Sequence, residues 1–301
     1  MVDDVPALQV VHLNKVFAVR RDSRVERSRR SAGSGLLGRR RLSPSPPRTV
    51  AAVEDVSFAV AQGKSLAIVG ESGSGKTTIA RMIVGLEHPT KGQIFVAGRE
   101  RSGRQVNSRE RRRRAREVQI IFQDPYSSLD PRMTVRACID EVLRLHFEHS
   151  GPMRNERIEQ LLDQVGLDRR QAEALPRALS GGQRQRVAIA RALASEPRVL
   201  ICDEAVASLD VSIQAQVLNL LSDIREATGV SYLFISHDLA VVRQVSDDVI
   251  VMKDGRVVES GLTEEVLESP KDPYTMRLIA AIPREGWRPT ASSDIESNEK
   301  D

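Results

Sequence analysis

The first third of the chain carries the hydrophobic pattern of strands around one buried run. Residues 8–17 (LQVVHLNKVF) alternate between apolar and polar positions and predict an edge strand, and the alternation resumes over 50–60. The short run 65–69 (SLAIV) is almost wholly apolar, as expected for a strand that is buried on both faces. It leads into a glycine-rich turn and then into residues 77–86, which predict a helix.

The remaining pattern alternates helical segments with further short apolar runs. Residues 118–122, 199–202 and 232–235 predict buried strands, whereas 131–178 are mainly helical in pattern, with four apolar residues on one helical face (Ile158, Leu161, Leu162 and Val165). A helix is predicted over 211–227, closed by Gly229, and a hairpin over 249–259, turning at Asp254-Gly255. This order predicts an α/β fold with a mainly parallel sheet and helices on both faces.

Composition adds limits on the class of protein. The chain has 301 residues, of which 29% are charged and 40% hydrophobic, and no apolar run approaches the roughly 18–20 residues that cross a bilayer. Met1-Val2-Asp3-Asp4 lacks the start of a secretory signal, so we expect no membrane crossing by this chain alone. Cys138 and Cys202 are far apart in sequence, which disfavours a disulfide framework or a zinc site, and Cys202 is expected to be buried.

The formal net charge is only +4, but many of the positive charges lie in two clusters of arginine. Residues 18–49 hold ten arginines against Asp22 and Glu26, and a second run covers 111–114 together with Arg116. Solvated loops are the favoured interpretation, and contact with nucleic acid or anionic lipid is the alternative. Neither cluster has interleaved aromatic residues for base stacking, so no nucleic-acid partner is expected.

The clearest chemical signal follows the buried run at 65–69. The motif is a phosphate-binding loop between a predicted strand and a predicted helix, with glycines that let successive backbone N–H groups point at an anion. Lys76 would reach the β and γ phosphates of a nucleotide, and the Thr77 hydroxyl would be a ligand of Mg²⁺. The nucleotide-binding residues of the motif are Gly70, Glu71, Ser72, Gly73, Ser74, Gly75, Lys76, Thr77 and Thr78.

Two further motifs complete the pattern. The apolar run at 199–202 ends in Asp203 and Glu204, which places one acid to hold Mg²⁺ through water and the other to polarise an attacking water. The sequence 179–183 (LSGGQ) opens a predicted helix that Ser180 would cap, and its glycines at a helix start form a second anion site. The chain therefore has two phosphate-binding helix starts but a single catalytic lysine.

This combination resembles the ATP-binding-cassette (ABC) family of ATPases, in which LSGGQ is the signature and precedes the acidic strand, here by 23 residues from Ser180 to Asp203. The resemblance implies a P-loop NTPase with a RecA-like core, an antiparallel β subdomain and a helical signature subdomain. It also implies ATP and Mg²⁺ as cofactors. In the family the signature faces the nucleotide of the opposite subunit, so a head-to-tail dimer with an identical or paralogous cassette is implied.

The resemblance assigns further residues to the site. Gln123 resembles the glutamine that senses Mg²⁺ and the attacking water, and His237 resembles the histidine that contacts the γ-phosphate. Asp210 belongs to a loop that crosses the dimer interface, and Phe17 occupies the place of the aromatic residue that stacks on adenine. The implied catalytic residues are Glu204, His237, Gln123 and Lys76; the signature residues at the nucleotide are Ser180, Gly181, Gly182 and Gln183; the metal residues are Thr77, Gln123 and Asp203.

Residues 122–135, 203–221 and 269–283 resemble the importer ATPases for oligopeptides, dipeptides and nickel. The resemblance implies an ATPase domain over 8–262, with the arginine-rich insert 18–49 and a helical subdomain at about 126–184, then a tail motif over 263–283 and a disordered tail over 284–301. The implied partners are two integral membrane permease subunits and, indirectly, an extracytoplasmic solute-binding protein. The implied location is peripheral, at the cytoplasmic face of the cell membrane.

Other functions remain open alongside the importer. The cassette ATPase of a carbon–phosphorus lyase complex resembles the same branch, but the tail motif over 269–283 favours the importer. A cassette ATPase for chromosomes or repair would carry long coiled-coil inserts, which this sequence lacks. A scaffold that binds nucleotide without hydrolysis is disfavoured because Glu204, Gln123 and His237 are all present. The transported solute is not readable from the sequence.

Overall fold

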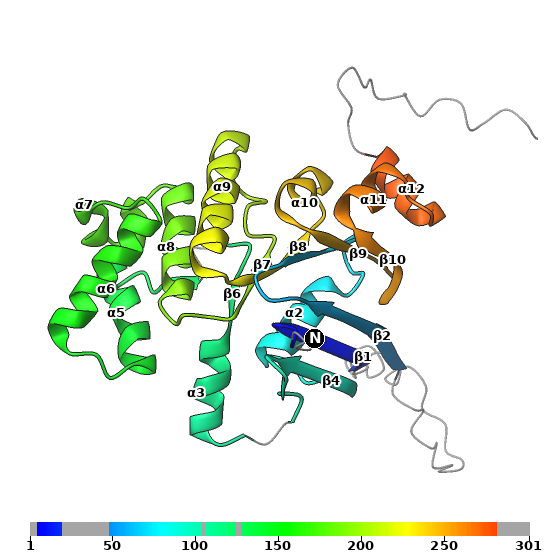
Figure 1. Cartoon of the computed structure of the whole chain (residues 1–301), viewed down its shortest axis with the longest axis horizontal. Coiled ribbons are helices and arrows are strands. Elements are labelled where there is room, and N and C mark those ends of the chain that lie inside the picture. Colours follow the sequence, from blue (N-terminus) through cyan, green and yellow to red (C-terminus); the bar gives the residue numbers. More distant parts are fainter. Residues whose placement is uncertain (1–4, 20–47, 104–105, 125–127, 282–301) are drawn as a thin grey trace, which may run out of the picture.

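The computed structural model of the 301-residue chain describes residues 5–19, 48–103, 106–124 and 128–281. Predictions for most of the insert (20–47), for residues 125–127 of the segment 122–135 and for the tail beyond 281 lie outside the described residues. Figure 1 shows two sheets near the centre of the molecule, with a group of helices to one side of them.

The first sheet is antiparallel and has the strand order β2-β1-β4-β5. Its strands are β1 (Leu8–Val19), β2 (Arg48–Val60), β4 (Lys91–Val96) and β5 (Arg99–Glu100). The prediction that residues 8–17 form an edge strand is wrong, because β1 pairs with both β2 and β4. The alternation in β1 arises from burial on one face only: Leu8 and Val10 are buried, whereas Gln9 is exposed.

The second sheet has the order β10-β9-β3-β8-β7-β6 and is mainly parallel, as the sequence predicts. Its strands are β3 (Ser65–Val69), β6 (Val118–Ile121), β7 (Val199–Asp203), β8 (Ser231–Ser236), β9 (Asp248–Lys253) and β10 (Arg256–Leu262). The β9–β10 hairpin is antiparallel and turns at Asp254-Gly255, as predicted. Strands β3 and β7 are buried throughout, but β6 lies at the edge with Gln119 and Ile120 partly exposed, so the prediction of full burial is wrong there.

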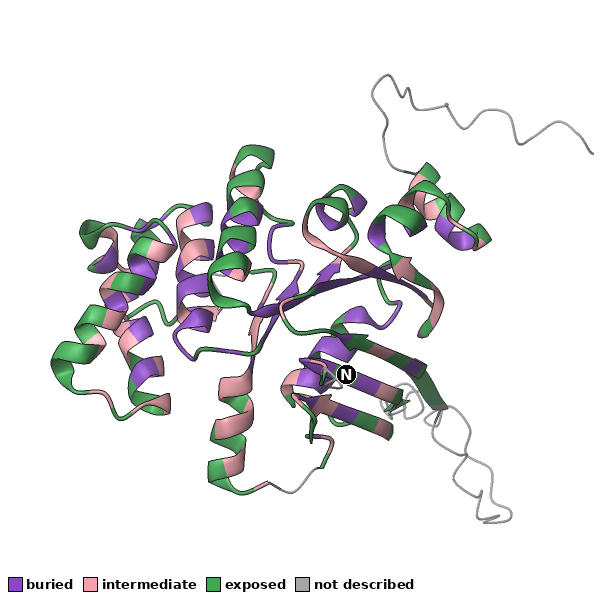
Figure 2. Ribbon diagram, viewed as in Figure 1, coloured by how far each residue is buried: buried purple, intermediate pink, exposed green. Residues whose placement is uncertain are grey.

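Helices contribute to the packing on both faces of the mainly parallel sheet. Each face of the mainly parallel sheet has its own hydrophobic core, and β3 supplies both, with Ala67 and Val69 on one face and Leu66 and Ile68 on the other. Figure 2 shows the buried residues along this sheet and on the inner sides of the helices. The helices are α2 (Lys76–Val84), α3 (Ser108–Glu117), α5 (Val135–His146), α6 (Gly151–Gln164), α7 (Arg169–Ala172), the 3₁₀ turn η1 (Pro176–Ala178), α8 (Gly181–Leu193), α9 (Val211–Thr228), α10 (Leu239–Val245), α11 (Thr263–Glu268) and α12 (Pro273–Ala280).

The helical predictions are confirmed in their main features. Residues 131–178 form α5, α6, α7 and η1, and the predicted apolar face of α6 is buried. Helix α9 ends at Gly229, which adopts a left-handed conformation with φ 68°. No helix in the described ranges is long and apolar enough to span a bilayer.

The second arginine run forms a helix, so its interpretation as a solvated loop is wrong. Asn107 caps α3 by accepting a hydrogen bond of 2.8 Å from the Glu110 backbone N–H. Hydrogen bonds from Arg113 and then Arg114 lower the pKa of Glu110 to about 2. These ion pairs at helical spacing offset the repulsion between neighbouring arginines.

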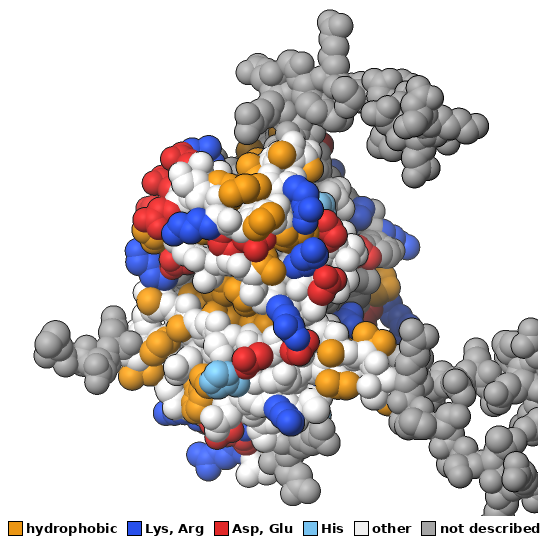
Figure 3. All heavy atoms as spheres, turned by 90° about the vertical axis from the view of Figure 1, so that its right-hand side faces the viewer, with side chains coloured by type: hydrophobic (Ala, Val, Ile, Leu, Met, Phe, Trp, Pro, Cys, Tyr) orange, Lys and Arg blue, Asp and Glu red, His pale blue; other side chains and the backbone are white. Residues whose placement is uncertain are grey.

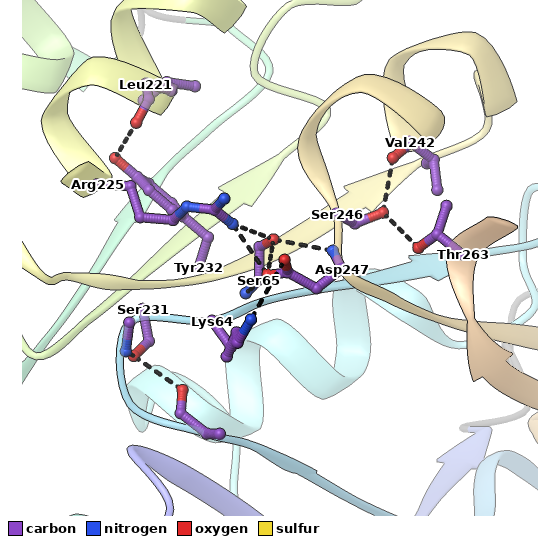
Figure 4. A network of polar contacts seen from close by, with 12 residues as sticks. Lys64, Ser65, Leu221, Arg225, Ser231, Tyr232, Val242, Ser246, Asp247 and Thr263 are labelled. Atoms are coloured by element: carbon purple, nitrogen blue, oxygen red, sulfur yellow. Dashed lines mark hydrogen bonds and ion pairs between the residues drawn. The ribbon is translucent and has the colours of Figure 1, made fainter.

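A polar network closes the sheet at the end opposite the glycine-rich loop (Figure 4). Asp247, which precedes β9, accepts hydrogen bonds from Ser65 N and Ser65 Oγ at 2.8 Å and from Arg225 Nη1 at 2.9 Å. Tyr232 on β8 donates from its hydroxyl to the Leu221 carbonyl at 3.0 Å. The network therefore ties the starts of β3 and β9 to helix α9.

We expect Asp247→Asn to lower the free energy of unfolding by about 1–3 kcal/mol at pH 7, because hydrogen bonds to a charged acceptor are weakened. Burial alone would raise the pKa of Asp247, but the Ser65 hydrogen bonds and the nearby Arg225 and Lys64 lower it overall. This stabilisation is present above the unfolded-state pKa and is lost as the pH falls through the folded-state pKa. Urea unfolding at pH 7 and at lower pH should show the wild-type advantage shrinking with acid.

The exposed Asp223 on α9 provides the control for this measurement. Asp223→Asn should leave the free energy of unfolding within about 0.5 kcal/mol of wild type. Equal stability of the wild type and Asp247→Asn at pH 7 would contradict the structural role of the network.

Candidate functional site

The glycine-rich loop joins β3 to α2, and close backbone neighbours require glycine at two of its positions, Gly70 and Gly75. Gly70, Gly73 and Gly75 have φ values of 148°, 85° and 104°, a region that favours glycine. A Cβ atom on Gly70 would lie 2.2 Å from the Met252 carbonyl oxygen, and one on Gly75 would lie 2.4 Å from that of Ala52. The loop is therefore enclosed by β9 on one side and β2 on the other.

The loop holds a buried cation and an unpaired hydroxyl. Lys76 is only 6% exposed, and its Nζ donates to the carbonyl oxygens of Gly70 at 2.7 Å and Glu71 at 2.8 Å. Burial lowers the pKa of Lys76, while Glu204 and Asp203 oppose this shift. The buried Oγ of Ser74 has no hydrogen-bond partner among the described residues. A buried donor without a partner beside a lysine fits a phosphate chain.

An acidic residue faces this loop from the end of β7. The Thr77 hydroxyl donates to Asp203 Oδ1 at 3.3 Å. Burial raises the pKa of Asp203, although the Thr77 hydrogen bond and the Lys76 charge oppose the shift. A hydroxyl and a carboxylate are oxygen ligands of the kind that Mg²⁺ prefers, so this pair fits a magnesium ion at the phosphates.

The second acid pairs with a histidine from the next strand. The carboxylate oxygen Oε1 of Glu204 lies 3.1 Å from Nδ1 of His237, which follows β8. Glu204 has φ 51°, a costly backbone conformation for a non-glycine residue, and its N–H donates to the Ile235 carbonyl at 2.9 Å. Its side chain is 23% exposed, so the carboxylate can reach a water molecule while the backbone is fixed.

The signature motif opens helix α8. Ser180 Oγ accepts a hydrogen bond from Gln183 N at 3.3 Å, and Gln183 Oε1 accepts one from Ser180 N at 2.9 Å, so the predicted cap is confirmed as a reciprocal capping box. A Cβ atom on Gly182 would lie 2.5 Å from Ile213 Cγ2, which explains the glycine by packing on α9. Ser180 and Gly181 are exposed, so the start of α8 faces outward.

The structure brings together only part of the predicted site. Asp203 and Glu204 lie beside Lys76 and Thr77 of the glycine-rich loop, and His237 contacts Glu204. Helix α8 instead packs on α5, α6 and α9, away from α2 (Figure 1). Within the described parts of the chain, no hydrogen bond or ion pair joins the signature residues 180–183 to the loop residues 70–78.

Three other predicted site residues lie at the surface. Gln123 is exposed, and its backbone carbonyl accepts a hydrogen bond from Ser208 Oγ at 3.4 Å. Asp210 caps α9 by accepting from Ile213 N at 3.0 Å. Phe17 is 37% exposed, and Lys15 Nζ lies 4.7 Å from the centre of its ring. Their roles at a nucleotide or an interface stay predictions.

One contact of the loop was not predicted from the sequence. The backbone N–H of Glu71 donates to the hydroxyl of Tyr274 at 3.0 Å. Tyr274 lies in the tail motif over 263–283. That motif resembles the peptide and nickel importers, but it gives no reason to place a tyrosine at the phosphate-binding loop. The contact joins residues 203 positions apart, so no local pattern could reveal it.

Comparisons with known proteins agree with this geometry. The family model described as "ABC transporter" matches residues 53–207. The dipeptide transport ATP-binding protein DppF of Haemophilus influenzae is 43% identical over 238 residues, covering 79% of this chain and 72% of that protein. The oligopeptide transport ATP-binding protein OppF of Lactococcus lactis subsp. lactis is 44% identical over 234 residues, covering 78% and 73%.

Solved structures show the same fold. A dimeric post-hydrolysis state of the ATP-binding cassette MJ0796 bound to ADP and Pi superposes with a TM-score of 0.68 at 26% identity, covering 85% of this chain and 98% of that one. The cbiO1 structure from Clostridium perfringens, part of the ABC transporter complex cbiONQ, gives a TM-score of 0.70 at 25% identity, covering 88% and 91%. The fold predicted from the sequence motifs is thereby confirmed.

Proposed function

Since this chain belongs to the ABC transporter family and is one of its ATP-hydrolysing cassettes, we propose that it powers the import of dipeptides, oligopeptides or a related solute such as nickel. The observation that carries the ATPase chemistry is the convergence of Lys76, Asp203, Glu204 and His237 at one glycine-rich loop. The peptide-transport names of its relatives support the substrate class.

Different residues of the site serve ATP binding and proton transfer. The loop N–H groups and Lys76 bind and orient the phosphates of ATP. Thr77, Asp203 and Gln123 would hold Mg²⁺, which would neutralise negative charge on those phosphates when bound. Glu204 accepts the proton of the attacking water, and His237, 3.1 Å from Glu204, orients the carboxylate toward the γ-phosphate.

The rest of the site is supplied by a second cassette, identical or paralogous. The exposed start of α8 supports this arrangement, because Ser180 and Gly181 are turned outward and not toward the loop of their own chain. In a head-to-tail dimer they would contact the nucleotide held by Lys76 of the other cassette. ATP would then favour the closed dimer by binding it more tightly than the open one.

The closing motion would act on two integral membrane permease subunits, and through them on an extracytoplasmic solute-binding protein. The cassette would lie at the cytoplasmic face of the membrane as a peripheral subunit. The names of the relatives favour this assembly over the carbon–phosphorus lyase alternative.

Purification of the tagged chain from detergent-solubilised membranes of its source tests this assignment. We expect two integral membrane proteins and a cassette partner to copurify, and a cognate binding protein loaded with peptide to stimulate ATP turnover. A tagged chain recovered from the soluble fraction with carbon–phosphorus lyase subunits, and without membrane proteins, would contradict the importer assignment.

A further inference from the structure

The tail motif packs directly against the phosphate-binding loop. Tyr274 near the start of α12 is only 6% exposed, and its hydroxyl accepts the hydrogen bond of 3.0 Å from Glu71 N. The Glu71 carbonyl in turn accepts the hydrogen bond of 2.8 Å from Lys76 Nζ. One residue of the loop thus links the tail to the lysine that would bind the phosphates.

The hairpin beside the loop is part of the same arrangement. Lys253 Nζ lies 5.2 Å from the centre of the Tyr274 ring. The neighbouring Met252 carbonyl is the atom that leaves no room for a Cβ on Gly70, and Gly255 N donates to the Ser74 carbonyl at 3.2 Å. The end of β9 and the tail therefore hold adjacent parts of the loop.

A carboxylate on β10 holds the tail motif against the rest of the protein. Glu259 accepts hydrogen bonds from Lys271 N at 2.8 Å and from Asp272 N at 3.1 Å. Burial would raise the pKa of Glu259, but these two backbone hydrogen bonds and the nearby charge of Lys271 help to lower it overall. Asp272 also accepts the hydrogen bond of 2.7 Å from Tyr274 N, which caps α12 at the tyrosine.

Specific hydrogen bonds hold the tail motif at this position. Figure 3 views the molecule from the side that carries α11 and α12, and acidic, basic and hydrophobic side chains are intermixed across it. Because a buried Tyr hydroxyl needs a partner and a loop N–H needs an acceptor, the Tyr274–Glu71 contact satisfies both groups at once.

We propose that Tyr274 is a positioning residue for ATP binding: the tail motif holds the phosphate-binding loop in its binding conformation through the Tyr274 hydroxyl. This inference rests on the proposed function and extends it to the tail. Fixing Glu71 in advance reduces the ordering that phosphate binding would otherwise require. Tyr274 reaches the loop through the Glu71 backbone N–H, so it should act on ATP affinity more than on the hydrolytic step.

The variant Tyr274→Phe in the full chain tests the proposal by removing the hydroxyl while keeping the ring. We expect the KM for ATP to rise about 2- to 10-fold, the range given by the loss of one hydrogen bond, with kcat much less affected. ATP turnover would be measured across ATP concentrations, together with thermal unfolding without nucleotide.

Tyr232→Phe is the matched control, because it also removes a buried tyrosine hydroxyl that makes one hydrogen bond of 3.0 Å. That hydroxyl donates to the Leu221 carbonyl at the opposite end of the sheet. It should lower the unfolding temperature and leave the KM for ATP unchanged. A wild-type KM in Tyr274→Phe, or an equal rise in both variants, would overturn the proposal.

A second variant loosens the tail without altering the tyrosine. Glu259→Ala removes the acceptor for Lys271 N and Asp272 N and should raise the KM in the same direction. An unchanged KM in a folded Glu259→Ala chain would contradict the fastening role. Lys76→Ala separates the two hypotheses. If this variant hydrolyses ATP like the wild type, the proposed catalytic site is wrong. If Lys76→Ala loses ATP turnover but Tyr274→Phe keeps the wild-type KM for ATP, only the role of the tail is rejected.

Discussion

The substitution Glu204→Gln is expected to reduce kcat for ATP hydrolysis by about 10²- to 10⁴-fold, the usual contribution of a general base. Glutamine keeps the shape of the side chain and can still hydrogen-bond to His237, which lies 3.1 Å from the carboxylate, but it cannot accept a proton. ATP affinity should be retained or increased, because one negative charge beside Asp203 is removed. Single-turnover hydrolysis and equilibrium binding of ATP separate these two effects.

Glu226→Gln provides the comparison for this measurement, because Glu226 is exposed on α9 outside the site. It removes the same charge from the chain and should leave kcat within about 2-fold of wild type, as for most surface substitutions. Near-normal turnover by Glu204→Gln would mean that another group takes the proton from water.

Elements with a strong local pattern could be predicted from the sequence. Strands β3 and β7 and the β9–β10 hairpin have burial or turn signals within a few residues, and α9 has a glycine at its end. The errors in β1 and β6 have one cause. Whether a strand lies inside a sheet or at its edge depends on its pairing partners, which are distant in sequence.

The arginine run over 111–114 was misassigned for a related reason. Its composition suggests repulsion, but Asn107 caps the helix and Glu110 pairs with two of the arginines. Those contacts follow from helical spacing, which a count of charges does not include.

The candidate site divides in the same way. Lys76, Thr77, Asp203 and Glu204 stand in motifs whose chemistry is local, so they could be identified before any fold was known. The distances between the site residues could not be predicted from the sequence, because the Glu204–His237 contact depends on the pairing of strands β7 and β8. The link from Tyr274 to the loop depends on the return of the tail to β10 and could not be predicted at all.

The paired substitutions Lys76→Ala and Ser180→Arg are expected to abolish ATP turnover separately and to restore it when mixed. Lys76→Ala should weaken ATP binding by about 30- to 5000-fold, since truncating one member of a buried charge pair typically costs about 2–5 kcal/mol. It also leaves Asp203 and Glu204 without their buried ammonium neighbour. Ser180→Arg places a bulky side chain at the exposed start of α8 and should leave ATP binding to the same chain intact.

If the purified chain hydrolyses ATP without a partner protein, that turnover comes from dimers of identical copies. Mixing the two variants then tests directly whether each site is shared between two chains. In a head-to-tail dimer of the two variants, one composite site contains an intact Lys76 from one chain and an intact Ser180 from the other. Random pairing should then restore up to about a quarter of the wild-type sites. Turnover would be measured against the fraction of each variant in the mixture.

The double variant Lys76→Ala/Ser180→Arg mixed with Lys76→Ala supplies the necessary control, because no pairing of these chains contains an intact lysine. That mixture should remain inactive at every ratio. Wild-type turnover by Ser180→Arg alone would mean that the start of α8 does not contact the nucleotide. If the purified wild-type chain turns over ATP, failure of the two single variants to complement would mean that the loop and the signature serve sites within one chain, against the separation of α8 from α2 in the fold.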